Sequence, residues 1–99
     1  MSSTGTGALE NMTAEEARSI IIKPYITEKA FNLIEAQNMI IFIVDRHSTK
    51  RNIKAALKTL YEAEAQDVNT LRSIRGKKAI VKFVADEGAR DLATTLGLV

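Results

Sequence analysis

The feature with the clearest chemistry is a cationic segment that runs from Val68 to Ala85 without any acidic residue. Gly76 in its middle predicts a tight turn, so the segment is typical of a small hairpin. Lysines protect sheet edges from aggregation, which explains one or two of these charges but not all of them. We therefore expect a polyanionic partner, and RNA or DNA phosphate is the commonest. The bases are Arg72, Arg75, Lys77, Lys78 and Lys82, and Asn69 and Thr70 add neutral donors suited to sugar hydroxyls and phosphate oxygens.

A second group of bases opens a predicted helix that Ser48 or Thr49 can cap. Lys50, Arg51 and Lys54 lie at its N-terminal end, where the helix dipole disfavours positive charge. Local stability therefore does not explain them. A phosphate at this end would gain from both the free backbone N–H groups and the basic side chains, which favours nucleic-acid binding over a merely solvated face.

A third segment, Pro24 to Lys29, joins a turn to a helix start. Thr27 supplies a capping hydroxyl, and Glu28 in the first turn complements the helix dipole, an effect of about 0.3 to 1 kcal/mol at a surface. These two effects alone explain the presence of Thr27 and Glu28. Taken by its composition, this segment predicts a helix start and no binding site.

Catalysis has little to build on in this chain. There is no cysteine, and the single histidine, His47, follows Arg46 on a predicted loop, where solvent exposure is the expected state. No nucleophile motif, phosphate-binding glycine loop, metal cluster or plausible carboxylate pair is present in the sequence. We expect no enzymatic activity, no cofactor or metal and no small-molecule substrate.

The bulk composition indicates one ordinary globular domain with a concentrated charge. The chain has 99 residues and a formal net charge of +2, yet from residue 46 to residue 82 ten bases stand against three acids. Aromatic residues make up only 5%, so large base-stacking platforms are not expected. The longest apolar run, residues 39–44, is too short to span a bilayer, and the first residues do not have the pattern of a signal peptide. We expect a cytosolic protein with no membrane insertion.

The elements that must position these groups follow from periodicity and turn residues. Residues 1–18 are expected to be a flexible tail, with a short helix if Thr13 and Glu16 form a capping box, and residues 19–99 a single domain. Strands are predicted at 20–22, at 39–44 with burial on both faces, and in the hairpin arms 67–74 and 78–85. Helices are predicted from Thr27 to Gln37 with a left-handed exit at Asn38, from Ser48 or Thr49 through Tyr61, and from a cap at Asp86 to Gly97. The order strand, helix, strand, helix, strand, strand, helix is that of an α+β fold.

Several short motifs together resemble the universal large-subunit ribosomal protein L23 family. They follow the family's order from residue 22 to residue 84, and the ending Leu92-Ala-Thr-Thr-Leu-Gly97 is similar to the archaeal form. The motifs are Pro24-Tyr-Ile-Thr-Glu-Lys29, Phe42-Ile-Val-Asp45, Ser48-Thr-Lys50, Ile53-Lys-Ala-Ala56, Val68-Asn-Thr70 and Lys77-Lys-Ala-Ile-Val81.

This resemblance implies a four-stranded antiparallel sheet with helices packed on it. It further implies binding to the third domain of large-subunit rRNA beside neighbouring ribosomal proteins, at the exit of the nascent-chain tunnel. The acidic position at Glu28 corresponds to one that docks a ribosome-associated factor in bacterial relatives, so here the family overrules the capping interpretation. The implied RNA-facing residues are Lys23, Thr27 and Lys29 in the first motif, Thr49, Lys50 and Arg51 in the second, and Asn69, Thr70, Lys77 and Lys78 in the third.

Two departures from the family pattern change what is expected. Asn52 stands where relatives often carry an acid, which makes the helix start more basic. Bacterial members extend the hairpin into a long basic loop inside the tunnel, whereas only a few residues separate Ile74 from Lys77 here. Signal recognition particle and the protein-conducting channel, which the family also contacts, are therefore the expected protein partners rather than a bacterial chaperone.

Two other functions are compatible with the charge pattern. One is a free-standing single-stranded RNA-binding module, although such modules use exposed aromatics on adjacent strands and both Phe42 and Phe83 fall at apolar positions. The other is a protein-interaction adaptor whose basic hairpin meets an acidic partner. Cosedimentation with large ribosomal subunits in high salt separates the ribosomal function from both.

Overall fold

The computed structural model describes residues 12–74 and 76–98. Most of the predicted tail, residues 1–11, and Arg75 of the hairpin lie outside the described residues. Helix α2 spans Ala14–Ile20 and begins with the expected capping box, in which the Glu16 N–H donates to Thr13 Oγ1 (3.1 Å) and the Thr13 N–H donates to Glu16 Oε1 (3.0 Å). Ala17 is fully buried and α2 packs against α4. The division of the chain into a tail and a domain at residue 18 stays a prediction.

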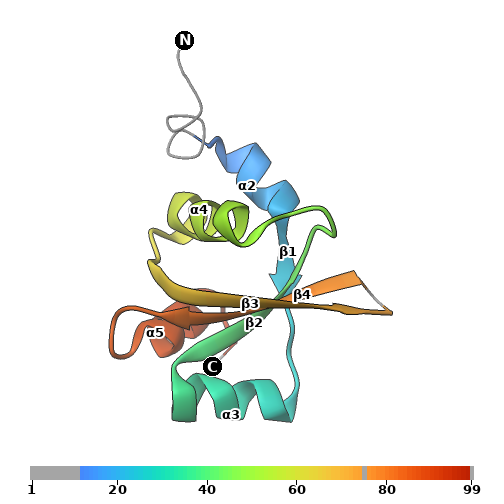
Figure 1. Cartoon of the computed structure of the whole chain (residues 1–99). Helices are drawn as coiled ribbons and strands as arrows, with labels where there is room; N and C mark the ends of the chain where they lie inside the picture. The colour runs from blue at the N-terminus through green and yellow to red at the C-terminus, as the bar shows by residue number, and fades with distance from the viewer. Residues whose placement is uncertain (1–11, 75, 99) are drawn as a thin grey trace.

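The described residues form a four-stranded antiparallel sheet with helices, as the sequence predicted (Figure 1). The strands are β1 (Ile21–Pro24), β2 (Met39–Val44), β3 (Ala65–Ser73) and β4 (Gly76–Phe83), in the order β1-β2-β4-β3. The first strand was expected to stop before Lys23 and Pro24, which was wrong. Because β1 is an edge strand, a proline without an N–H group can lie within it and remove no ladder hydrogen bond.

Three further helices connect and follow the strands: α3 (Glu28–Gln37), α4 (Lys50–Tyr61) and α5 (Gly88–Thr95). Thr27 and Thr49 are the N-caps of α3 and α4, and Asn38 leaves α3 in the left-handed conformation with φ 58°, as predicted. The prediction that Asp86 caps α5 was wrong. Glu87 occupies the cap position without a side-chain bond, and Asn38 Oδ1 accepts the Ala89 N–H at 2.8 Å.

One face of the sheet carries the core. In β4, Ala79, Val81 and Phe83 are buried and alternate with Lys78, Ile80 and Lys82, as the sequence pattern predicted. The strand register places the buried residues on the same face as Ile40, Phe42 and Val44 of β2 and Val68 of β3. Residues from every described helix join this cluster, among them Ala17, Ile34, Ile53, Leu57, Ala89 and Leu92.

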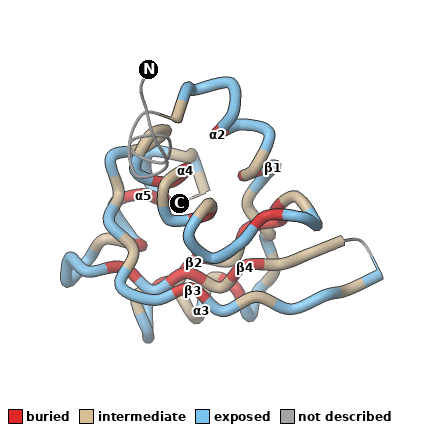
Figure 2. The backbone as a smooth tube through the Cα atoms, turned by 45° about the horizontal axis from the view of Figure 1, so that its top comes forward, coloured by how far each residue is buried: buried red, intermediate tan, exposed pale blue. Residues whose placement is uncertain are grey.

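The opposite face of the sheet is open. Lys23, Asn69, Leu71 and Lys82 are exposed there, and Lys78 and Ile80 are half-buried. The expected burial of β2 on both faces is confirmed at Ile43, which is 7% exposed, whereas Ile41 is half-buried. The β3–β4 hairpin extends past the rest of the domain, and its outer part is intermediate or exposed (Figure 2). This open face and the projecting hairpin together carry Lys23, Arg72, Lys77, Lys78 and Lys82.

Candidate nucleic-acid interface

The hairpin contacts both of the other segments that carry candidate residues, through two adjacent lysines. Because side chains alternate along a strand, Lys77 lies on the helix-covered face and Lys78 on the open face. Lys77 Nζ donates to the Ser48 carbonyl oxygen at 2.6 Å, just before α4. Lys78 Nζ lies 3.9 Å from the centroid of the Tyr25 ring, just before α3. Three segments far apart in sequence therefore meet at the base of the hairpin.

The start of α4 holds an uncompensated positive charge. Thr49 Oγ1 accepts the Asn52 N–H at 3.1 Å, and Asn52 Oδ1 accepts the Thr49 N–H at 3.2 Å, so Asn52 completes a capping box. An amide does this as well as a carboxylate would, but without a negative charge. Lys50, Arg51 and Lys54 are all exposed, and the first turn contains no acidic residue. The helix start is therefore available to an anion.

The start of α3 is less basic and its threonine has a structural task. Thr27 Oγ1 accepts the Ala30 N–H at 3.0 Å, so one lone pair of the hydroxyl serves as the N-cap, and its proton and second lone pair remain for a partner. Glu28 and Lys29 are exposed in the first turn. Both side chains are therefore accessible to a partner.

The open face brings two candidate lysines into one row across the sheet. The register pairs Lys23 with Ile43, Ile43 with Lys78, and Lys78 with Leu71. With neighbouring strands about 4.8 Å apart, the backbones of Lys23 and Lys78 are separated by roughly 10 Å. The row therefore has two cations separated by an isoleucine and bordered by a leucine.

The other candidate residues of the hairpin do not all share this face. Asn69 lies on the open face, but Thr70 and Arg72 lie on the opposite one, since Thr70 pairs with Ala79 and Arg72 with Lys77. Lys82 is on the open face, but the residue opposite it on β3 is Asp67. Positive charge therefore dominates at the turn end of the hairpin and weakens toward the other end.

None of the candidate cations in the described residues forms an ion pair within the protein. Across residues 12–74 and 76–98 the structure holds a single ion pair, between exposed Lys58 and Glu64 at 3.1 Å. The candidate lysines and arginines in the described chain thus keep their charge available for a partner. That arrangement is typical of a phosphate-binding surface.

Apolar side chains beside the cations were missed by the sequence analysis. Tyr25 contacts Lys78 and is followed by exposed Ile26 (53%). Leu71 (45%), which pairs with Lys78, and Ile74 (105%) are also exposed. Tyr25, Ile74 and Lys78 line a shallow hollow together with Ser73. The position of Tyr25 in the motif Pro24 to Lys29 was visible in the sequence, but its contact with a lysine 53 positions later was not. Apolar contacts of this kind suit riboses and unstacked bases beside phosphates.

The two adjacent lysines should respond differently to removal of the charge. Lys77→Met should lower the free energy of unfolding by about 1 to 2 kcal/mol, because the Ser48 carbonyl loses a charge-assisted hydrogen bond. Lys78→Met should lower the free energy of unfolding by less than about 1 kcal/mol, which is the size of an exposed cation–π contact. It should nevertheless lower the affinity for RNA more than Lys77→Met does. Urea unfolding and RNA titration of both variants check this. Equal effects of the two variants on both measurements would contradict the distinction.

Two other features, a cluster of metal ligands and a membrane-spanning helix, are absent from the described residues. Within it, no three or more His, Cys, Asp or Glu side chains gather as metal ligands would. None of the helices described has the length and apolar character that a membrane crossing requires.

Comparison with known proteins identifies the family. The model of the family described as Ribosomal protein L23 matches residues 19–92. The large ribosomal subunit protein uL23 of Methanobrevibacter smithii is 44% identical over 84 residues, which cover 84% of this chain and 98% of the relative. The protein of the same name from Methanococcus maripaludis strain C5 is 39% identical over the same shares of the two chains. With this match over most of its length, and with archaeal relatives of this similarity, the chain belongs to the ribosomal protein L23 family.

Proposed function

We propose that this chain is a structural component of the large ribosomal subunit that binds large-subunit rRNA through its hairpin and the starts of α3 and α4. The observation that carries this proposal is the meeting of three segments at Lys77 and Lys78, with unpaired cations around them. Family membership supports the ribosomal setting. The protein then acts by neutralising phosphates where rRNA helices come together, and it performs no chemistry.

The finer placement rests on the family resemblance. The third domain of large-subunit rRNA is the proposed binding partner, together with neighbouring ribosomal proteins, near the exit of the polypeptide tunnel in the cytoplasm. The register pairs Ser73 with Gly76, so only residues 74 and 75 connect the two strands. A hairpin this short is proposed to anchor the protein at the surface of the subunit without reaching into the tunnel.

Fractionation of cells that produce the tagged full-length chain tests the ribosomal assignment. The chain should sediment with large subunits and stay with them after a high-salt wash, since its release from an assembled subunit requires contacts with rRNA and with neighbouring proteins to break together. A pool found only in the soluble fraction would contradict the proposal. A chain released by moderate salt would indicate a peripheral RNA-binding protein.

Glu28 provides a separate test of the exit-site surface, where signal recognition particle and the protein-conducting channel are the proposed partners. Glu28→Ala should leave incorporation into subunits intact and lower stability by less than about 1 kcal/mol, since Glu28 is exposed in the first turn of α3. We expect weaker docking of signal recognition particle to the variant ribosomes, by about two- to tenfold if one rim charge is lost. Glu35→Ala, an exposed acid at the other end of α3, is the matched control. Unchanged affinity for Glu28→Ala would remove this residue from the docking surface.

A further inference from the structure

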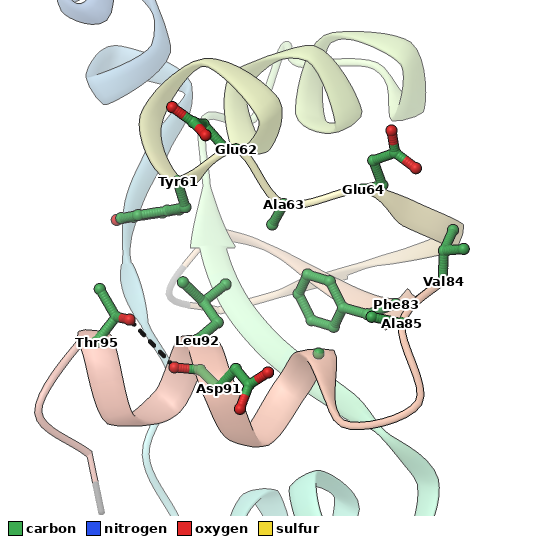
Figure 3. A pocket seen from close by; sticks show the side chains of 11 residues that line it. Tyr61, Glu62, Ala63, Glu64, Phe83, Val84, Ala85, Asp91, Leu92 and Thr95 are labelled. Carbon is green, nitrogen blue, oxygen red and sulfur yellow. Dashed lines mark hydrogen bonds between the residues drawn. The ribbon is translucent and has the colours of Figure 1, made fainter.

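A groove with an apolar floor lies between the end of α4 and helix α5, away from the turn of the hairpin (Figure 3). Its volume is about 400 Å³, and Phe83 and Leu92 form its floor at 2% and 5% exposure. The side chains of Tyr61, Phe83 and Leu92 lie between the two helices. The groove has room for one or two side chains of a partner.

Small residues create this hollow. Ala63, Ala85 and Gly88 all line it and contribute little volume. A Cβ atom at Gly88 would lie 2.8 Å from the Cβ atom of Phe83, so the close approach of α5 to β4 excludes a side chain there. The hollow therefore results from the packing of α5 against Phe83, with alanines on both sides of it.

The charge at this groove is opposite to the charge of the hairpin. Glu62 and Glu64 lie on its α4 side and Asp91 on its α5 side, and Asp86 and Glu87 belong to the loop that leads into α5. Lys58 neutralises Glu64, and Arg90 is the base next to Asp91. The excess of carboxylates disfavours a phosphate backbone here and favours a cationic partner.

We propose that this groove binds a basic amphipathic segment of another protein. A large apolar side chain of that segment enters the hollow above Phe83 and Leu92, and lysines or arginines beside it face Glu62 and Asp91. This inference is independent of the proposed rRNA binding, because it uses a different surface and the opposite charge. The chain as a whole has a net charge of +2, so attraction of a basic peptide must come from this local excess of acid.

Two-dimensional NMR of the isotopically labelled full-length chain tests the proposal. The probe is a synthetic helical peptide of about 14 residues with a leucine face and a lysine face, and a peptide with glutamates in place of the lysines is its counterpart. The lysine peptide should shift the amide signals of Ala63, Val84, Gly88 and Leu92. The glutamate peptide should leave them unchanged.

Variants distinguish specific binding in the groove from non-specific binding to the protein surface. The double variant Glu62→Gln, Asp91→Asn should lower the affinity for the lysine peptide by about two- to tenfold, as expected when two charges at the edge of the groove are lost. Glu15→Gln, Glu35→Gln changes the net charge equally on exposed positions of α2 and α3 and should have no effect. Ala85→Leu should also weaken binding by filling the hollow, whereas Ala36→Leu on the exposed side of α3 should not.

The outcomes that overturn the proposal are equally definite. Shifts that appear mainly on the hairpin, equal binding of the glutamate peptide, or equal loss in the two charge variants would each exclude this groove as a site for basic segments. If an RNA oligonucleotide shifts the amide signals of the same groove residues, the groove is a second RNA contact and the proposal is wrong.

Discussion

Replacing Arg72, Lys78 and Lys82 together with glutamine is expected to weaken binding of the full-length chain to a large-subunit rRNA fragment by about 10- to 100-fold at about 0.1 M salt. Each cation that contacts a phosphate releases condensed counterions on binding, so the plot of log affinity against log salt should also become shallower by about two to three. Titrations of the chain and the variant at several salt concentrations measure both quantities. Lys77 is left in place because it holds the loop before α4.

The control for this variant changes the same number of charges elsewhere. Arg18→Gln, Lys58→Gln and Arg90→Gln lie on α2, in the last turn of α4 and on α5, and all three side chains are exposed. This combination should reduce affinity by less than about threefold, since only long-range attraction is lost and salt screens it. Similar losses in both triple variants would mean that net charge governs binding and that the hairpin has no special role.

Asn38→Ala is expected to be the most destabilising change at a partly exposed position, with a loss of about 3 to 5 kcal/mol in the free energy of unfolding. Asn38 Nδ2 donates to the carbonyl oxygens of Phe83 (3.1 Å) and Ala85 (2.7 Å), and Oδ1 accepts from Ala89 N (2.8 Å). One side chain at the end of α3 thus connects the end of β4 with the start of α5. Alanine loses these bonds and tolerates φ 58° less well than asparagine does.

Companion variants separate the two causes. Asn38→Gly relieves the backbone strain but still loses the hydrogen bonds, so it should cost about 1 kcal/mol less than Asn38→Ala. Asn69→Ala, on the exposed open face, should change stability by less than about 0.5 kcal/mol. Urea unfolding of the full-length chain measures all three. A loss below about 1 kcal/mol for Asn38→Ala would show that water replaces these bonds readily.

Much of the fold was predictable because its causes are local in sequence. The capping residues Thr13, Thr27 and Thr49 bond to backbone three positions ahead, and the alternation in β4 separates core from surface within a single strand. Two predictions failed where a distant segment decided the outcome. Pro24 remains in a strand because β1 is at the edge of the sheet, and α5 begins with a bond from Asn38 instead of a cap by Asp86.

Some features of the candidate interface were likewise predictable from local sequence, and others depend on the tertiary structure. Charge clustering and the family motifs were sufficient to select the hairpin and the start of α4 as cationic, since charge is a property of composition. Which of Asn69 and Thr70 lies on the open face follows from the observed register, which also places Asp67 opposite Lys82. Tyr25 could not be assigned from sequence, because its contact with Lys78 requires β1 and β4 to flank β2.

By itself, the sequence determined the α+β order of elements, the family and the concentration of positive charge in the hairpin, because these depend on residue types and short-range spacing. Only the tertiary structure decided which sheet face is open, how Lys77 and Lys78 join three segments, and where Ala63, Ala85 and Gly88 leave an acidic-rimmed groove. The physical reason is strand order. With β2 and β4 at the centre of the sheet, residues dozens of positions apart become neighbours, and no local pattern encodes those contacts.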